Sequence, residues 1–356
     1  MKSLKSLQCI FMLFILCIVR LGCCAPQDND EVTTSNPPDD QSKSIETYSA
    51  AEMCSSYSEF IYKYIKNSTL SDDKDILIKC KDCHNNAISN TPEVVPNVND
   101  ERTAPREFLH VALLGDSNGI WLYSGSLISN RWILSVAHFE GIFDNFTRWA
   151  RLRDPNYLSE TDDATPMDYQ IDQIVVHPDF QIPSLYNDIA LFHLDRDVKF
   201  SAYVQPICLN ADPNWQSTHS QAVITPGWGR IQYGGPWKWD ALNAFSSGLL
   251  KVNSDIVSAD LCKSDYFISS STPQLMQGIV EDSMLCAGVD GEEDSCVGFG
   301  GSSLQIAHAN YTFMYTQVGV LSAGKERCAT KEFPYFYMRV SKYLPWIERI
   351  VWPKSG

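Results

Sequence analysis

Short runs of apolar residues follow one another from about residue 108 onward, and polar or turn-forming residues separate them. Examples are WLYSGSLIS, RWILSVAHF, YQIDQIVVH, DIALFHL, AVITPGWG and FMYTQVGVLS. These runs have the length of β-strands, and several alternate between apolar and polar positions. The pattern predicts an all-β domain with one sizeable core.

A short amphipathic helix is predicted next to Cys54, because apolar residues recur there at helical spacing. We expect its apolar face to pack on the main domain. The apolar positions that follow Met53 are Tyr57, Phe60, Ile61 and Tyr64.

A second helix is predicted at the end of the chain, in the segment PWIERIVW. Pro345 suits the first position of a helix, where its missing N–H costs nothing. The apolar residues after it form one stripe that is expected to dock on the β domain. They are Trp346, Ile347, Ile350 and Val351.

The first 24 residues have the pattern of a secretory signal peptide. Lys2 and Lys5 precede the apolar stretch LQCIFMLFILCIV, and small residues around Gly22 follow it. The stretch is short for a membrane span, and no later segment has a run of about 18 apolar residues. A secreted, extracellular protein with no membrane anchor is therefore expected.

The composition is acidic, with a formal net charge of −15 at pH 7. Removing residues 1–24 takes away three basic residues and no acidic one, so the mature chain is more acidic still. Nucleic acid is a poor partner for such a surface. Residues 25–50 are rich in Asp, Asn, Ser, Thr, Gln and Pro, which predicts a disordered tether. Sequons for N-glycosylation begin at Asn67, Asn145 and Asn310.

Eight of the twelve cysteines remain after removal of the signal peptide. An even number in an oxidising compartment indicates disulfides. Cys80 and Cys83 have the spacing of a zinc knuckle, but no second such pair completes a zinc site, so no metal is expected.

Five separated motifs then appear in a fixed order. His138 lies in SVAHF and Asp188 in NDIALFHL, and PGWG, MLCAG and DSCVGFGGSSL follow. Together they resemble the trypsin and chymotrypsin family of serine proteases. The resemblance implies two six-stranded antiparallel β-barrels with a C-terminal helix over residues 97–356. Residues 25–96 then form a polar leader that contains the short helix. The segment PREFLHVALLG is similar to the start of the catalytic domain in arthropod clotting and immune cascade proteases.

The resemblance assigns His138 as the general base and Asp188 as the residue that orients it. Seven residues, VGFGGSS, lie between Cys296 and Leu304, where the family has a pattern like QGDSGGP, so the resemblance places the nucleophile position at Gly300. Glycine has no hydroxyl, and loss of the triad serine removes about a millionfold in kcat. Ser302 and Ser303 are displaced along the loop too far to substitute for it. Gly298 and Gly300 occupy the oxyanion-hole positions.

Further departures from the family affect activation and specificity. Phe299 stands where the family has the aspartate that receives the new N-terminus, and PNVND at 96–100 lacks the basic residue and apolar terminus of an activation site. In the specificity pocket, Asp294 and Ser295 are retained at the base. A wall glycine is replaced by Tyr335, and Ala323 stands where the family has the aromatic residue of the wall strand, directly before Gly324.

The resemblance also implies the disulfide pattern. Cys262 is expected to pair with Cys286, Cys296 with Cys328, and Cys208 with Cys80 or Cys83, with Cys54 taking the other. The disulfide beside the histidine is lost, since Tyr123 and Phe139 occupy its two positions, and we expect the two rings to pack together.

These features predict a secreted pseudoprotease that needs no cofactor and acts by binding an extracellular protein. The partner would be an active protease, a zymogen or an inhibitor of a protease cascade. Two alternatives remain. One is an active trypsin-like endopeptidase, and the other is an adhesive or structural glycoprotein.

Overall fold

The computed structural model describes 15 segments of the chain. They are residues 46–67, 100–103, 107–116, 120–139, 147–154, 156, 165–201, 203–212, 215, 222–228, 248–267, 273–288, 300–311, 314–324 and 334–354. The predicted signal peptide, Cys80, Cys83 and the 289–299 segment lie outside these residues. None of the helices in the described segments is long and apolar enough to cross a membrane.

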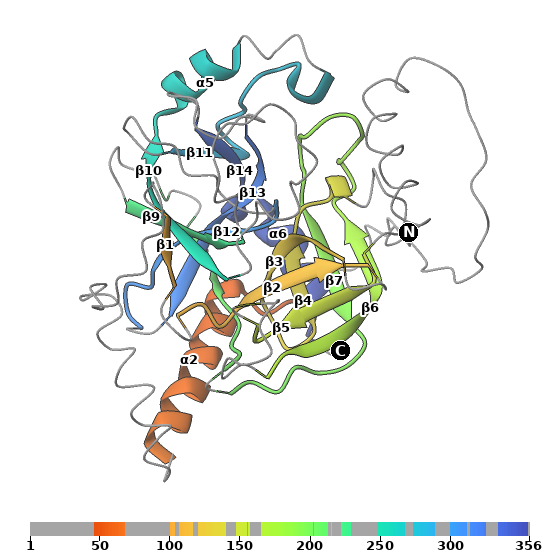
Figure 1. The fold of residues 1–356 in the computed structure, drawn as a ribbon, viewed down its shortest axis with the longest axis vertical. Helices are drawn as coiled ribbons and strands as arrows, with labels where there is room; N and C mark the ends of the chain where they lie inside the picture. Colours follow the sequence, from red (N-terminus) through yellow and green to blue (C-terminus); the bar gives the residue numbers. More distant parts are fainter. Residues whose placement is uncertain are drawn as a thin grey trace, which may run out of the picture. The chain divides into compact units, whose positions relative to one another are not determined.

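The first β-barrel is closed by six antiparallel strands in the order β2-β3-β4-β7-β6-β5 (Figure 1, gold to green). Its inward side chains come from apolar runs, and Leu113, Leu134 and Phe192 are fully buried. The strands are β2 (Val111–Gly115), β3 (Trp121–Leu127), β4 (Trp132–Ser135), β5 (Trp149–Leu152), β6 (Met167–Val176) and β7 (Ala190–Leu194).

The second barrel also has six antiparallel strands, and it closes because β9 pairs with both β10 and β12. Around the barrel the order is β9-β10-β11-β14-β13-β12. The strands are β9 (Ala222–Gly227), β10 (Leu250–Val257), β11 (Met284–Gly288), β12 (Ser303–Ala307), β13 (Tyr315–Ala323) and β14 (Tyr335–Arg339).

Short elements complete the second half of the fold. β1 (Asp100–Arg102) pairs with the edge of β10, and β8 (Cys208–Leu209) pairs in parallel with β13. α5 (Ala259–Phe267) and the 3₁₀ helix η5 (Pro273–Leu275) lie between β10 and β11. The predicted all-β class with two six-stranded antiparallel barrels is confirmed.

The C-terminal helix α6 (Val340–Val351) is present but starts earlier than predicted. Pro345 lies inside it rather than at its first position. Val340, Tyr343, Leu344 and Ile347 are buried, so the apolar stripe extends one turn toward the N-terminus and anchors that turn. Pro345 itself is exposed, which lets water satisfy the carbonyl that its missing N–H leaves free.

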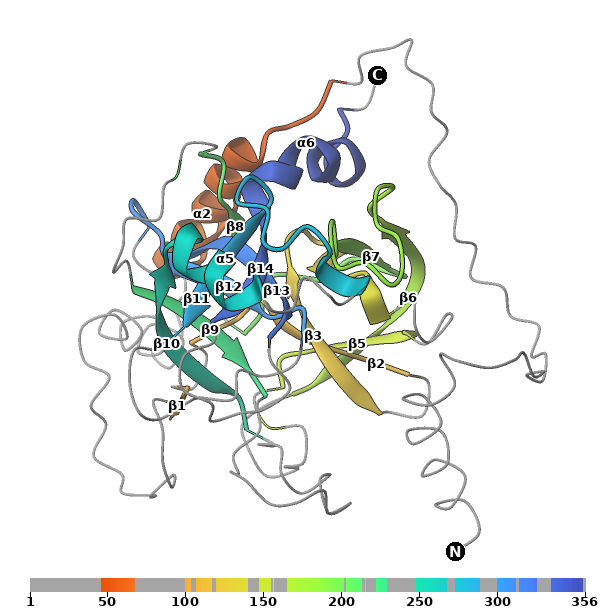
Figure 2. The same cartoon turned by 90° about the horizontal axis from the view of Figure 1, so that it is seen from above.

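Helix α2 (Ala50–Asn67) is the helix that was predicted next to Cys54. Its start packs near the end of α6, since Ala50 N–H donates to Glu348 Oε1 at 2.7 Å and Tyr48 N–H donates to the Trp352 carbonyl at 2.9 Å. Figure 2 shows α2 and α6 on the same side of the barrels. Buried Tyr57 donates its hydroxyl to the Ile128 carbonyl at 2.9 Å. The expected packing of the helix on the main domain is confirmed at Tyr57.

Candidate active site

His138 and Asp188 lie at the ends of two neighbouring strands of the first barrel. β4 and β7 are antiparallel partners, with Ser135 opposite Ala190. His138 comes shortly after the end of β4, and Asp188 comes just before the start of β7. The strand pairing therefore brings together two residues that are 50 positions apart in the sequence.

The carboxylate of Asp188 holds the imidazole of His138 in one orientation. His138 Nδ1 lies 2.7 Å from Asp188 Oδ2. Asp188 Oδ1 accepts the backbone N–H groups of Ala137 and His138 at 2.9 and 2.8 Å. Asp188 is fully buried, whereas the His138 side chain is 15% exposed. A carboxylate at Nδ1 places the proton there, so that Nε2 can accept a proton from a neighbouring hydroxyl.

Ser322 is a further member of this arrangement, contributed by β13 of the second barrel. Its hydroxyl donates to Asp188 Oδ2 at 2.5 Å. The sequence-based prediction missed it, because a single serine in an apolar strand has no distinguishing pattern. Its place directly before the predicted pocket-wall residue Ala323 was the available signal.

Gly300 lies beside the imidazole. A Cβ added to it would be 3.6 Å from His138 Cε1 and 3.2 Å from Phe139 Cε2. The Gly300 carbonyl accepts the N–H of Ser124 at 2.9 Å. A side chain at residue 300 would therefore start next to the edge of the His138 ring.

Gly301 fixes the turn that follows. Its φ is +86°, and its N–H donates to the Leu321 carbonyl at 2.8 Å. A Cβ there would overlap the Ser124 carbonyl and the Ser135 hydroxyl. Only glycine fits this left-handed position without strain.

Ser302 and Ser303, the two nearest serines after Gly300 in the chain, are buried. They are 1% and 2% exposed. The Ser303 hydroxyl donates to Gln305 Oε1 at 2.8 Å, and that oxygen also lies 2.8 Å from His110 Nε2. Burial lowers the pKa of His110 to about 3, so its ring is neutral in this network.

Tyr123 and Phe139 form a stacked pair next to His138. Their ring centroids are 4.3 Å apart and their planes differ by 12°. Phe139 also packs on the His138 ring, with centroids 4.3 Å apart. The expected packing of these two rings is present in the structure.

In the predicted specificity pocket, the ring of Tyr335 lies directly on Gly324. A Cβ at residue 324 would overlap the Cδ1 and Cε1 atoms of Tyr335. The pocket-base residues Asp294 and Ser295 lie outside the described residues, as do Gly298 and Phe299.

Two disulfides lie within the described residues. Cys262 of α5 is bonded to Cys286 of β11, the pairing that the resemblance implied. Cys208 is bonded to Cys54, so the expectation that its partner is Cys80 or Cys83 is wrong. The reason is the packing of α2, which places Cys54 and Tyr57 in one buried cluster with Cys208. Cys296 and Cys328 lie outside the described residues.

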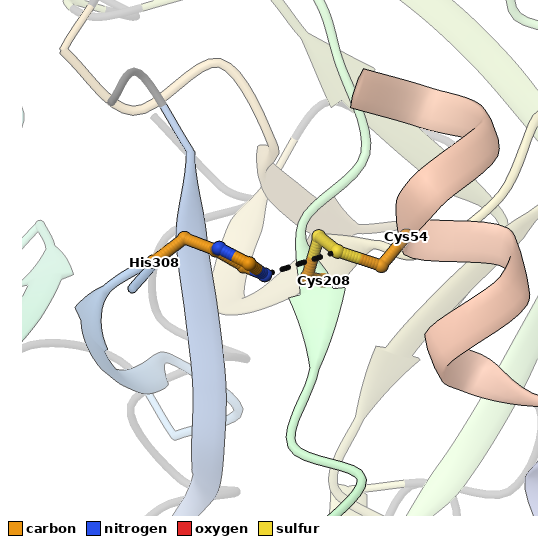
Figure 3. A group of neighbouring side chains, drawn as sticks. All are labelled: Cys54, Cys208 and His308. Carbon is orange, nitrogen blue, oxygen red and sulfur yellow. Dashed lines mark hydrogen bonds between the residues drawn. A yellow bond between two sulfur atoms is a disulfide. The ribbon is translucent and has the colours of Figure 1, made fainter. Parts of the chain in front are cut away.

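One group of the described residues brings metal-ligand atoms together. Cys54, Cys208 and His308 place theirs within 4.8 Å of one another (Figure 3). The two sulfurs are joined in the disulfide, so neither is a thiolate ligand in this state.

The predicted glycosylation sites fall in different settings. Asn310 is exposed. Asn67 is the last residue of α2, and Asn145 lies outside the described residues.

Comparison with known proteins adds the family. Residues 98–347 match the family model described as Trypsin. The chain is similar to "Venom serine protease Bi-VSP" of Bombus ignitus, with 32% identity over 228 residues, which cover 63% of this chain and 58% of that protein. It is also similar to "Serine protease snk" of Drosophila melanogaster, with 35% identity over 254 residues, covering 68% of this chain and 54% of that one.

"Phenoloxidase-activating factor 1" of Holotrichia diomphalia is 30% identical over 292 residues, which cover 74% of each chain. The chain spans little more than half the length of the first two relatives. The family match covers most of this chain, and the fold has two six-stranded antiparallel barrels. The chain therefore belongs to the trypsin family of serine proteases.

Proposed function

We propose that this chain is a secreted, non-catalytic member of the trypsin family that acts by binding a protein of an extracellular protease cascade. The observation that carries the proposal is the glycine at residue 300, next to the imidazole edge of His138. Acyl transfer by this family needs a hydroxyl at that place. With none there, His138 and Asp188 have no nucleophile to activate.

Other serines are poor substitutes for the missing hydroxyl. Ser302 and Ser303 are buried, and the Ser303 hydroxyl is already bonded to Gln305. A nucleophile displaced by more than about 1 Å from its attack geometry loses roughly two orders of magnitude in rate. Neither serine therefore supports hydrolysis.

Two aromatic side chains restrict the site further. Phe139 would stand 3.2 Å from a Cβ at residue 300, tighter than an ordinary van der Waals contact. Tyr335 covers Gly324, where the family has an open pocket wall. The site is therefore poorly shaped for a substrate side chain as well as lacking its nucleophile.

The sequence of the activation region supports the same conclusion. Phe299 cannot accept a newly released ammonium group, and PNVND contains no cleavage site of the usual kind. Burying an ammonium without a partner costs several kcal/mol. Both sides of the ion pair that activates the family are thus replaced.

The partner is proposed to be an active protease, a zymogen or an inhibitor. Relatives carry names such as "Phenoloxidase-activating factor 1" and "CLIP domain-containing serine protease B15". A trypsin-like fold can serve binding without its chemistry, because function depends on particular sites and not on the fold. The predicted signal peptide and the even number of cysteines that remain after its removal favour an encounter outside the cell.

Activity-based labelling tests the loss of chemistry. We expect the secreted full-length chain to show no labelling by a fluorophosphonate, and Gly300→Ser alone to yield little turnover of Lys or Arg peptide substrates. The double variant Gly300→Ser with Tyr335→Gly should label more than Gly300→Ser. Labelling of the unaltered chain that disappears in His138→Ala would overturn the proposal.

An assay of the zymogen activation rate tests the proposed regulatory role. The purified chain is titrated into an activation reaction that contains an active trypsin-family protease and its zymogen substrate. We expect a saturable change in the activation rate that is identical for the His138→Ala variant. An effect that requires His138 would contradict a non-catalytic role.

The second candidate is an active trypsin-like endopeptidase, which the intact pair of His138 and Asp188 favours. It predicts cleavage after Lys or Arg by the unaltered chain. The labelling experiment separates the two candidates directly.

A further inference from the structure

His308 lies against the disulfide that joins helix α2 to the second barrel (Figure 3). Its Nε2 is 3.3 Å from Cys54 Sγ, within hydrogen-bond reach of a sulfur acceptor. His308 follows the end of β12, and its N–H donates to the Met314 carbonyl at 2.9 Å. The ring is thus held by the barrel, whereas Cys54 belongs to the leading helix.

The hydrogen bonds of His308 decide which ring nitrogen carries the proton. Nδ1 accepts the backbone N–H of Asn310 at 3.1 Å. The proton of the neutral ring therefore lies on Nε2 and points at Cys54 Sγ. Burial lowers the pKa of His308, which favours this neutral form. Tyr311 stacks on the ring with centroids 4.5 Å apart and keeps its plane in place.

We propose that the Cys54–Cys208 disulfide is a thiol–disulfide exchange site, at which a small thiolate of the glutathione type attacks Cys208 and Cys54 is the leaving group. This inference does not depend on the proposed loss of proteolytic activity. A donor at one sulfur stabilises negative charge on that sulfur, and a stabilised thiolate leaves faster. The Nε2–H group of His308 faces Cys54, so it assigns the direction of the reaction.

The atoms and electrons of the exchange balance as follows. The attacking thiolate forms a bond to Cys208 Sγ, the bond between Cys208 and Cys54 breaks, and its electron pair stays on Cys54 Sγ. A second thiolate then attacks the mixed disulfide and releases Cys208. Two small thiols are oxidised to one disulfide, and the two cysteines take up the two protons that those thiols gave to solvent.

Reduction would remove the covalent link but leave α2 in contact with the domain. Tyr57 keeps its bond to the Ile128 carbonyl, and Ala50 keeps its bond to Glu348. The two sulfurs then stay close enough to reoxidise. Because Cys54 and Cys208 are 5% and 2% exposed, attack needs a local fluctuation that exposes Cys208 Sγ while Cys54 stays beside His308, and a small thiol can enter where a folded protein cannot.

The second disulfide provides an internal reference. Cys262 and Cys286 are also buried, at 0% and 4% exposure. Within the described part of the chain, no histidine forms a hydrogen bond to either of these sulfurs. Both disulfides are therefore buried, and they differ in that only Cys54–Cys208 has an imidazole beside it among the described residues.

The experiment measures the reduction rate of each disulfide separately in the full-length secreted chain. Reduced glutathione is added, samples are quenched with iodoacetamide, and cysteine peptides are quantified by mass spectrometry. We expect His308→Ala to slow reduction of Cys54–Cys208 by about tenfold, the order expected for loss of a hydrogen bond to a charged sulfur, and to leave Cys262–Cys286 unchanged. The trapped mixed disulfide should be on Cys208.

Three results would overturn the proposal. If His308 only shields the bond, His308→Ala will make reduction faster, and if it has no role, the rate will not change. A mixed disulfide found on Cys54 would reverse the assigned direction. His308→Gln retains a side-chain N–H donor and should stay within about threefold of the unaltered chain, which tests the idea even if the alanine variant folds poorly. In denaturant the difference between variants should vanish.

Discussion

Replacing Asp188 by alanine should destabilise the folded domain strongly, although the chain is proposed to have no catalytic use for it. Asp188 accepts hydrogen bonds from the Ala137 and His138 backbones, from His138 Nδ1 and from the Ser322 hydroxyl. The residue is fully buried. Its removal therefore leaves several donors without an acceptor inside the protein.

The magnitude follows from counting those donors. The His138 ring is partly exposed and can turn toward water, so its loss is small. The two backbone N–H groups and the Ser322 hydroxyl cannot, and each buried unsatisfied donor costs about 1–3 kcal/mol. Asp188→Ala should lower the free energy of unfolding by about 3–9 kcal/mol. A domain with a total of about 5–15 kcal/mol would lose a large part of its stability.

Guanidinium chloride unfolding followed by tryptophan fluorescence measures this change. His138→Ala is the matched control, because it leaves Asp188 with three of its four donors and should cost only about 1–2 kcal/mol. We expect a lower midpoint for Asp188→Ala at an unchanged slope, which identifies a loss of stability rather than a change in the unfolded state.

A cost below about 1 kcal/mol for Asp188→Ala would refute this reasoning, as would equal costs for the two variants. Confirmation would give both residues a structural role that does not depend on catalysis. Asp188 would be retained because it connects the first barrel to Ser322 of the second, and His138 because its ring forms a hydrogen bond with that carboxylate.

Three other predictions concern the rest of the domain. Lys251 Nζ and Glu107 Oε1 form a buried ion pair, 3.0 Å apart, which joins the second barrel to the segment before β2. In chemical unfolding, Lys251→Met should lower the free energy of unfolding by about 3–5 kcal/mol, and the double variant with Glu107→Leu should lower it much less. Gly301→Ala should cost more than about 1 kcal/mol and broaden the thermal transition, because its positive φ and its contacts leave no room for a Cβ. Because the pKa of His110 is lowered to about 3, the unfolded chain binds a proton below about pH 6.5 that the folded chain does not. The free energy of unfolding should therefore fall by roughly 1 kcal/mol per pH unit from pH 6.5 toward 3. His110→Gln should flatten this slope when unfolding is measured as a function of pH.

The sequence alone determined the class and most of the strands. The period-2 runs and turn residues predicted the all-β domain, and five ordered motifs predicted two barrels and the positions of His138 and Asp188. The strand predictions succeed because periodicity is a local property of the chain, and the barrels and site positions follow from the family resemblance that the five motifs carry. The start of α6 was predicted too late, because proline is read locally as a first helical residue, whereas the burial of Val340 and Tyr343 extends the helix past it.

The tertiary structure decided which distant residues meet. Ser322 reaches Asp188 from 134 positions away, and Cys54 reaches Cys208 from 154 positions away. Neither pairing leaves a mark in the local pattern, because each depends on how one element packs against another. The same is true of Phe139 and Tyr335, because only the packed barrels set how close their rings lie to Gly300 and Gly324. Sequence therefore specified the elements and the glycine at residue 300, and packing between elements specified the side chains that surround that glycine.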